Sequence, residues 1–227
     1  LVNSGPVFVG QPDLTWPDTA PFPTELSSRY SQFKNGNAKT RNRVIYVAAN
    51  DGMLHGFSET IKDTTGNDIL GSGGKEVLAY IPSSLFSSSS SNEGLHYLTD
   101  QRYQHKYYND LTPSVSDIYA NLGTGLKWHT ILFNGLRGGG RGVYALNVTD
   151  PTTFSETNAA DIVLWEFNNT HDADLGFTYS QPQIGMTNDG SWVAIFGNGY
   201  NDTGDGKAKL FILKIVEGVD GVWSASD

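Results

Sequence analysis

A short apolar segment that begins at a proline recurs three times along the chain and marks the start of a repeated unit. The three prolines are Pro6, Pro113 and Pro182, which lie 107 and 69 residues apart. Each is followed by runs of β-branched and aromatic residues with a glycine-rich turn between them. Such runs predict β-strands, and helical periodicity is nearly absent. A strand unit that recurs at uneven spacing is typical of β-propeller blades that carry insertions.

Each unit contains a predicted β-hairpin. In the first unit Asp51 and Gly52 separate two strand-like runs, and this dipeptide tolerates positive φ, so a tight turn is expected. The predicted strands cover residues 44–50, 53–57 and 77–81 in the first unit, 130–133, 143–148 and 162–167 in the second, and 192–196 and 208–215 in the third. The sequence therefore predicts an all-β fold, with about three blades of a β-propeller.

We interpret residues 1–227 as one domain with insertions at about 13–39 and 83–110. Insertions in propellers lie in loops on the faces of the ring. The five serines at 87–91 are expected to form a flexible tip, whereas the aromatic stretch 95–110 is either a short helix or a packed loop. Closed propellers have about 4–8 blades, so we expect part of a longer domain with an exposed edge strand.

The composition argues against several classes of protein. The chain has 15 Lys and Arg against 24 Asp and Glu, a formal net charge of −9, which argues against a nucleic-acid partner. Its apolar runs are far shorter than the ~20 residues that span a bilayer, so no membrane span is predicted. The absence of cysteine excludes disulfides, zinc thiolates and a thiol nucleophile.

No catalytic set is evident, and we predict a non-enzymatic protein with no catalytic or cofactor-binding residue. Residues 140–145 (GRGVYA) match a short dinucleotide-binding pattern, but they lie in a predicted hairpin, where no helix N-terminus follows to receive a pyrophosphate. The histidines show no metal-binding spacing, and their default interpretation is a core or surface position.

One acidic turn is a candidate calcium site. Asn201, Asp202 and Asp205 supply an amide and two carboxylates in a glycine-rich turn, and Ca²⁺ binds several oxygens at ~2.4 Å. The turn lacks the regular alternation and the final bidentate acid of a full calcium loop, so a solvated hairpin tip is the alternative. In a second acidic turn, Asp172 and Asp174 are expected to cap backbone amides.

Two arginines and several aromatic residues are candidates for surface contacts. Arg137 and Arg141 flank three glycines and are interpreted as exposed loop residues, with a contact to a partner carboxylate as the alternative. Tyr103, Tyr107 and Tyr108 are the candidates for a carbohydrate contact. The five tryptophans are expected to pack between blades.

Several motifs resemble the PilY/PilC family, and they occur in the family's order from about residue 1 to residue 215. They are residues 2–6 (VNSGP), 49–57 (ANDGMLHGF), 80–82 (YIP), 138–146 (GGGRGVYAL), 172–182 (DADLGFTYSQP) and 196–201 (FGNGYN). Two positions depart from the family's pattern: Arg137 stands where a small residue is expected, and Leu111 where glycine is expected.

The resemblance implies a modified, about seven-bladed propeller of the quinoprotein-like type, the C-terminal domain of a large secreted protein of Gram-negative bacteria. It implies export through the periplasm to the cell surface and the tip of the type IV pilus, with minor pilins as partners. The implied roles are pilus biogenesis (promoting assembly and opposing retraction), twitching motility, virulence, and adhesion to host or abiotic surfaces. The family's calcium loop of alternating aspartates is not found in this chain, so calcium is an expectation for the intact protein.

Two alternative functions stay open at this point. The first is a periplasmic quinone-dependent dehydrogenase, because such enzymes share the propeller. Its chemistry needs a calcium-bound quinone in the channel of a closed ring, and a shared fold is weak support for a shared function. The second is a carbohydrate-binding module that uses exposed aromatic side chains.

Overall fold

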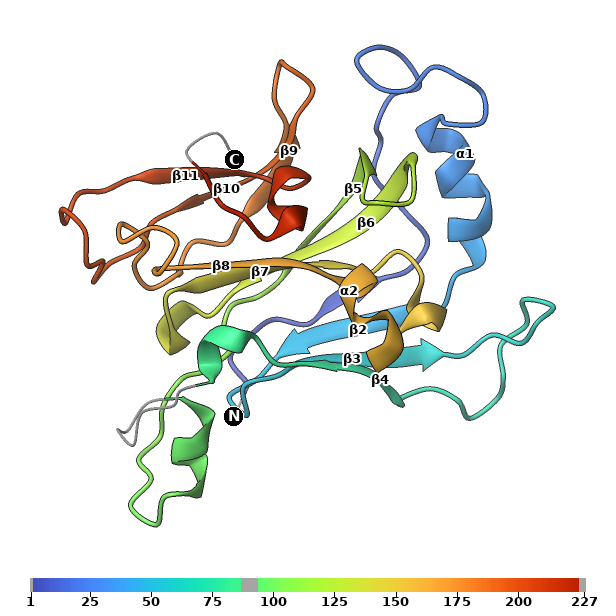
Figure 1. Cartoon of the computed structure of the whole chain (residues 1–227). Coiled ribbons are helices and arrows are strands. Elements are labelled where there is room, and N and C mark those ends of the chain that lie inside the picture. The colour runs from blue at the N-terminus through green and yellow to red at the C-terminus, as the bar shows by residue number, and fades with distance from the viewer. Residues whose placement is uncertain (1, 87–93, 225–227) are drawn as a thin grey trace.

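The computed structural model describes residues 2–86 and 94–224, and its strands form three antiparallel sheets (Figure 1). In each sheet the strands are neighbours in chain order. The first sheet consists of β1 (Val7–Val9), β2 (Arg43–Ala48), β3 (Leu54–Thr60) and β4 (Glu76–Tyr80); the second of β5 (Ser114–Asn121), β6 (Leu126–Gly135), β7 (Gly142–Asn147) and β8 (Val163–Asn168); the third of β9 (Gln183–Met186), β10 (Trp192–Gly197) and β11 (Leu210–Lys214). The predicted all-β units are confirmed.

The innermost strands of the three sheets, β1, β5 and β9, lie side by side. The residues around the recurring prolines join them. The amide of Gly5 donates to Thr112 Oγ1 at 2.7 Å, and the hydroxyl of Ser114 donates to the carbonyl of Pro182 at 2.6 Å. The proline-led strands therefore mark the line along which neighbouring blades meet.

The second sheet is buried on both faces because its side chains alternate between two hydrophobic clusters. On β6, Ile131 and Phe133 pack in the cluster shared with the third sheet, whereas Leu132 packs in the cluster shared with the first sheet. On β7, Ala145 and Leu146 divide in the same way. Burial of a side chain of this size contributes about 1.5–3 kcal/mol, so these two clusters hold the three sheets together.

Helices in the described part of the chain are short and lie in the connections between strands. They are α1 (Tyr30–Asn35), α2 (Ala159–Ile162) and the 3₁₀ helices η1 (Asn37–Thr40), η2 (Ser83–Leu85), η3 (Leu95–Thr99), η4 (Arg137–Gly139), η5 (Pro151–Thr153), η6 (Glu156–Asn158) and η7 (Glu217–Asp220). None of the described helices has the length and apolar character needed to cross a membrane.

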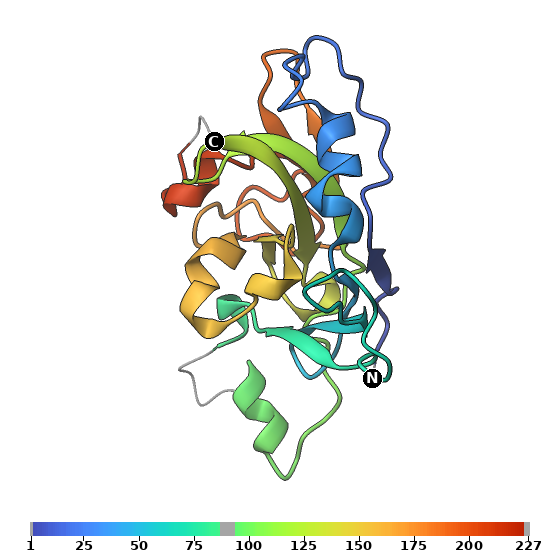
Figure 2. The same ribbon diagram turned by 90° about the vertical axis from the view of Figure 1, so that its right-hand side faces the viewer.

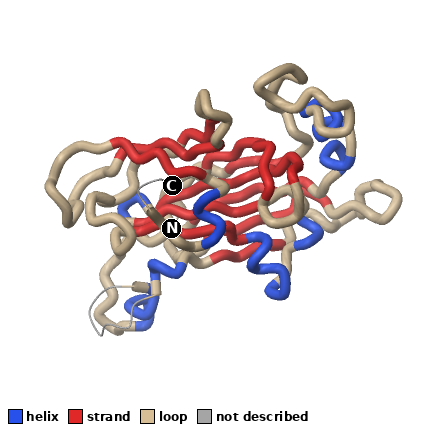
Figure 3. The backbone as a smooth tube through the Cα atoms, turned by 45° about the horizontal axis from the view of Figure 1, so that its top comes forward, coloured by secondary structure: helices blue, strands red, loops and turns tan. Residues whose placement is uncertain are grey.

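The strands run between two groups of connections at opposite ends of the molecule (Figure 3). At one end, on the left in Figure 1, lie the β2–β3, β6–β7 and β10–β11 connections together with the 83–110 segment. We call it the 83–110 end. At the other end, which faces the viewer in Figure 2, lie α1 and the β3–β4 connection. We call it the α1 end.

The first predicted insertion lies between β1 and β2 and packs into the core. Tyr30 and Phe22 contact Trp128, with ring centroids 4.8 and 6.4 Å apart, and Trp16 contacts Trp192 at 5.5 Å. These contacts place the insertion beside the second and third sheets. Packing of the tryptophans between blades is confirmed: Trp128, Trp165 and Trp192 are buried in the cluster between the second and third sheets, and Trp16 and Trp223 pack against it.

The second predicted insertion lies between β4 and β5. Its serine tip at 87–91 lies outside the described residues. The 95–110 stretch combines both of the predicted possibilities, since η3 is followed by a packed loop. The loop ends at Asn109, which is fully buried and donates to the hydroxyl of Tyr144 at 3.0 Å. The base of this insertion is therefore fixed to the second sheet.

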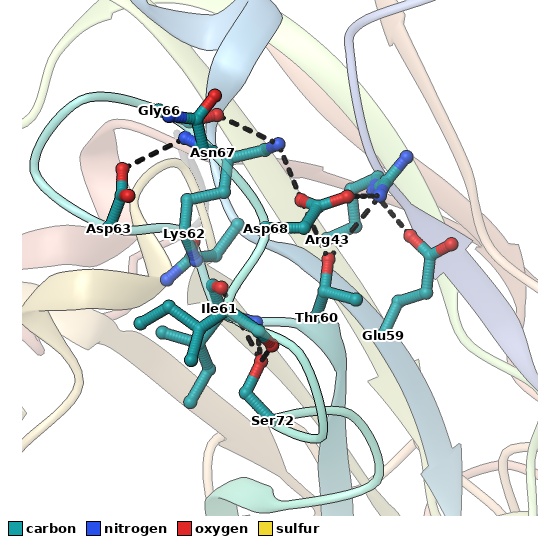
Figure 4. A network of polar contacts seen from close by, with 12 residues as sticks. Arg43, Glu59, Thr60, Ile61, Lys62, Asp63, Gly66, Asn67, Asp68 and Ser72 are labelled. Carbon is teal, nitrogen blue, oxygen red and sulfur yellow. Dashed lines mark hydrogen bonds and ion pairs between the residues drawn. The ribbon is translucent and has the colours of Figure 1, made fainter.

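A network of polar contacts orders the β3–β4 connection, residues 61–75 (Figure 4). The carboxylate of Asp63 accepts from the amides of Thr65 and Asn67 at 2.8 and 2.9 Å, and Lys62 pairs with Asp68 at 2.8 Å. The network presents Leu70, whose side chain is fully exposed, at the α1 end.

Candidate interaction surface

An exposed group of aromatic and cationic side chains lies at the 83–110 end. It consists of Tyr107, Arg137, Phe177, Tyr179 and Tyr200, which we call the aromatic surface. Tyr107, Tyr179 and Tyr200 are 48, 40 and 52% exposed. The five residues come from four connections: β4–β5, β6–β7, β8–β9 and β10–β11. All three sheets thus contribute to one surface.

The side chains of the aromatic surface hold one another in place. Tyr200 stacks on Phe177, with ring centroids 5.5 Å apart, and lies 5.3 Å from Tyr179. The hydroxyl groups of Tyr200 and Tyr179 lie 3.3 Å apart and share a hydrogen bond, which is the main cause of a raised pKa of Tyr179. The guanidinium of Arg137 lies 5.5 Å from the centre of the Tyr179 ring, within the range of a cation–π contact.

The backbone of Arg137 is left-handed, with φ of 54°, which is uncommon for a residue with a side chain. The hydroxyl of Thr178 accepts from the amides of Leu136 and Arg137 at 3.0 and 3.2 Å. The guanidinium lies 3.6 Å from the buried carboxylate of Asp110. These contacts offset the backbone strain and explain how an arginine occupies this position, where the resemblance led us to expect a small residue.

Two glycines position Tyr107 on the aromatic surface by letting the chains approach closely. A Cβ added at Gly139 would lie 1.7 Å from the carbonyl oxygen of Tyr108, and one added at Gly138 would lie 3.1 Å from the Tyr107 ring and 3.0 Å from the Tyr179 hydroxyl. The second insertion therefore packs directly against the glycine-rich loop between β6 and β7. Leu111, where the resemblance led us to expect glycine, is buried against Gly135.

The structure separates the three tyrosines proposed for a carbohydrate contact. Tyr107 is exposed, but Tyr108 is only 2% exposed and Tyr103 is half-buried, so the predicted set of three exposed aromatics is wrong. Tyr108 is buried because it packs with Leu136 and other residues in the cluster between the first and second sheets.

The interpretation of Arg137 and Arg141 as exposed loop arginines also needs correction, because both are half-buried. Arg137 pairs with Asp110, and the guanidinium of Arg141 lies 5.4 Å from the centre of the Phe177 ring. A contact of either residue with a partner carboxylate stays a prediction.

Intramolecular contacts occupy the acidic turn proposed for calcium. The carboxylate of Asp202 accepts from the amides of Gly204 and Gly206, both at 3.1 Å, and Asp205 pairs with Lys207 and Lys209 at 3.0 and 3.2 Å. Asn201 adopts a left-handed backbone, with φ of 57°. The calcium site at Asn201, Asp202 and Asp205 stays a prediction.

The second acidic turn behaves as expected for a backbone cap. The carboxylate of Asp172 accepts from the amide of Asp174 at 2.8 Å, and Asp174 pairs with Lys209. Across residues 2–86 and 94–224, no group of three or more His, Asp or Glu side chains is arranged to hold a metal ion. Residues 140–145 lie at the entry to β7, as the hairpin interpretation predicts.

Sequence reasoning did not identify Phe177, Tyr179 and Tyr200 as members of a surface, although all three lie in motifs that carry the family resemblance. The available signal was the placement of the three aromatic residues in connections, with Phe177 and Tyr200 each directly after a glycine. A backbone bridge joins Phe177 to Tyr200, and a Cβ at Gly199, whose φ is 75°, would lie 1.8 Å from the carbonyl oxygen of Phe177. Contacts of this kind are not visible in a sequence.

Comparison with known proteins gives the same fold and family. Residues 1–223 match the family model of the PilY1 beta-propeller domain. The type IV pilus biogenesis factor PilY1 of Pseudomonas aeruginosa strain PAO1 is 38% identical over 222 residues, and a PilY1 homolog of Xylella fastidiosa is 37% identical over 220 residues. Both alignments cover 96% of this chain but only 16% and 13% of the two relatives.

The crystal structure of the PilY1 C-terminal domain from Pseudomonas aeruginosa aligns with 93% of this chain and 35% of its own length, with 33% identity and a TM-score of 0.64. The predicted β-propeller is thereby confirmed, and the three sheets correspond to part of that domain. From the family model and the level of identity, the chain belongs to the PilY1 β-propeller domain family.

Proposed function

We propose that this chain is a non-enzymatic binding module of a type IV pilus biogenesis protein, and that the aromatic surface is its contact with a pilus-tip partner, a minor pilin. The exposed tyrosines and Arg137 carry the proposal. Tyrosine and arginine dominate the binding energy of protein interfaces, because each combines a large contact area with a polar group. The names of the relatives support a role in pilus biogenesis.

The side chains of the aromatic surface are preorganised for binding a partner. Tyr179 and Tyr200 are ordered by each other and by Arg137 before any partner arrives. Binding then costs little side-chain entropy, which is the advantage of a preorganised surface. A module bound at the pilus tip in this way would promote assembly, oppose retraction, support twitching motility, and present the remaining surface to a host cell or an abiotic surface.

The proposal is tested in the longer protein that contains this chain. We expect the double variant Tyr179→Ala and Tyr200→Ala to reduce the number of surface pili and the twitching zone, since both changes remove contact area without touching the buried clusters. Leu70→Ala is the matched control, because Leu70 is exposed at the opposite end of the molecule. Wild-type piliation and motility in the double variant, with the protein present at its normal level, would refute the assignment of this surface.

An immunoblot of sheared, purified pili beside the cell-envelope fraction tests the location. We expect the longer protein in the pilus fraction, and a loss of this enrichment in the double variant. Detection in the envelope alone would contradict a tip location. It would favour the alternative of a periplasmic quinone-dependent dehydrogenase. That alternative is measured by adding the quinone and calcium to the intact domain and assaying turnover.

A further inference from the structure

The first half of β6 has an edge that no neighbouring strand covers. β6 pairs with the full length of β5 through its residues Leu126 to Phe133, but with β7 only from Ile131 to Gly135. At the end of this ladder the carbonyl of Thr130 accepts from the amide of Val148 at 2.9 Å, and the amide of Thr130 donates to Thr149 Oγ1 at 2.9 Å. The chain then turns away at Pro151.

The register shows which backbone groups point to this edge. In an antiparallel ladder the N–H and C=O of one residue point to the same neighbour, and successive residues alternate. Thr130 and Leu136 form their bonds on the β7 side, with Leu136 donating to the carbonyl of Gly142 at 3.1 Å. The backbone groups of Leu126 and Trp128 therefore point to the same side, beyond the end of β7. Within the described ranges these groups have no hydrogen-bond partner on that side.

Two cavities meet at this edge, one on each side of the strand. The larger, about 710 Å³, lies at the α1 end and is lined by Phe33, Tyr119 and Trp128 among others. The smaller, about 310 Å³, is lined by His129 and Ile162 among others. Both are also bounded by Lys127, Thr149 and Asp150. Both cavities therefore border the position that a further strand would occupy.

We propose that this edge takes an extended peptide segment of a partner protein as an added β-strand. Unpaired donors and acceptors that alternate at strand spacing are satisfied by another extended backbone, and side chains on its two faces would enter the two cavities. The free stretch, Leu126 to His129, is matched by a segment of about four residues, roughly 13 Å long.

The side chains around the edge indicate the chemistry of the segment. Phe33, Tyr119 and Trp128 offer an apolar seat for one of its side chains. Lys127 is exposed, lines both cavities and makes no ion pair within the described residues, whereas the charge of Arg41 is balanced by nearby Asp117 and Asp150. An exposed lysine without an ion-pair partner among the described residues, placed between the two cavities, favours a segment with an acidic side chain beside an apolar one.

A phage-displayed library of random dodecapeptides, panned against the full chain, supplies the probe. We expect enrichment of peptides with alternating apolar residues and an acidic residue, and binding of a synthetic copy measured by fluorescence polarisation. Leu126→Pro removes one edge donor without breaking a bond to β5, so it should weaken binding at least about tenfold. Leu126→Ala is the control and should stay within about threefold of wild type. Equal binding by wild type and Leu126→Pro, or no enrichment at all, would overturn the proposal.

Amide hydrogen exchange locates the bound peptide. In the free chain the amides of Leu126 and Trp128 should exchange faster than those of Leu132 and Asn134 on the same strand, and the peptide should slow them. Unchanged exchange with the peptide bound would overturn strand addition. So would slow exchange of both amides in the longer protein without peptide, because a segment of that protein would then occupy the edge. The edge lies at the end opposite the aromatic surface, so either proposal can fail alone.

Discussion

Gly139 sets the position of the second insertion, and a methyl group there tests this directly. Its Cβ would lie 1.7 Å from the carbonyl oxygen of Tyr108, so the backbone of one of the two loops must move. We expect Gly139→Ala to lower the free energy of unfolding by at least about 2 kcal/mol, measured by chemical denaturation followed by tryptophan fluorescence. Gly185→Ala is the control, because its Cβ would meet no atom within 4 Å. Equal stability of the two variants would contradict this role for Gly139.

The buried imidazole of His129 predicts a loss of stability in acid. Burial, assisted by the charge of Lys127, lowers the pKa of His129 to about 4. The unfolded chain, with a histidine pKa of about 6.5, binds this proton first, so the free energy of unfolding falls as the pH drops from about 6.5 to about 4.

The loss should amount to roughly 3 kcal/mol at the acid end of this window. Urea titrations between these two pH values measure it. His129→Gln should remove most of the decline, whereas His105→Gln, at an exposed position, should retain it. An unchanged pH dependence in His129→Gln would show that other groups cause the acid sensitivity.

At the scale of elements, α1 depends on one hydrogen bond to the second sheet. The hydroxyl of Tyr30 donates to the buried carboxylate of Asp117 at 2.6 Å. Tyr30→Phe removes this donor, and we expect a loss of about 1–3 kcal/mol in the free energy of unfolding, because the carboxylate stays buried.

Tyr46→Phe is the matched control for that measurement, since Tyr46 is also buried but its hydroxyl has no hydrogen-bond partner among residues 2–86 and 94–224. Its removal should leave stability unchanged or slightly raised. Denaturation curves of the two variants, recorded under the same conditions, separate the hydrogen bond from the loss of a hydroxyl. A similar effect in both would mean that the bond to Asp117 contributes little.

Strand prediction succeeded where a short apolar run is bounded by glycine. Both strands of the first hairpin and β10 are close to the predicted ranges. It failed at the start of β6, where only 130–133 was predicted although the strand begins at Leu126. Trp128 and His129 are buried there by α1 and by the chain after β7, which are distant in sequence, so no local alternation marks them.

The aromatic surface shows the same limit for the site. Tyr107 was identified from a local cluster of tyrosines, but Tyr179 and Tyr200 were not, because they meet only after the connections of two sheets converge. The motifs that carry the resemblance contain both residues, which shows that a family pattern can hold site residues whose role the local sequence does not reveal.

At the scale of the whole molecule, the third sheet has an exposed apolar strand at one edge. β11 pairs with β10 on one side only, and Leu210 and Ile212 are 64 and 49% exposed. We expect the isolated chain to associate at increasing concentration, as measured by sedimentation velocity, because such an edge recruits a second copy. Ile212→Lys should reduce the association and Leu70→Lys should not. A chain that stays monomeric at all concentrations would contradict this.

The two hydrophobic clusters also divide the insertions between them. Tyr30 of the first insertion packs in the cluster between the second and third sheets, whereas Leu85 and Tyr108 of the second insertion pack in the cluster between the first and second sheets. Each insertion thus packs in a separate hydrophobic cluster, and the second sheet lies between the two clusters. During evolution, one insertion can therefore be replaced in response to one ligand, while the other insertion keeps its packing and its conformation. Chimaeras that exchange one insertion at a time are the natural way to assign ligands to the two ends.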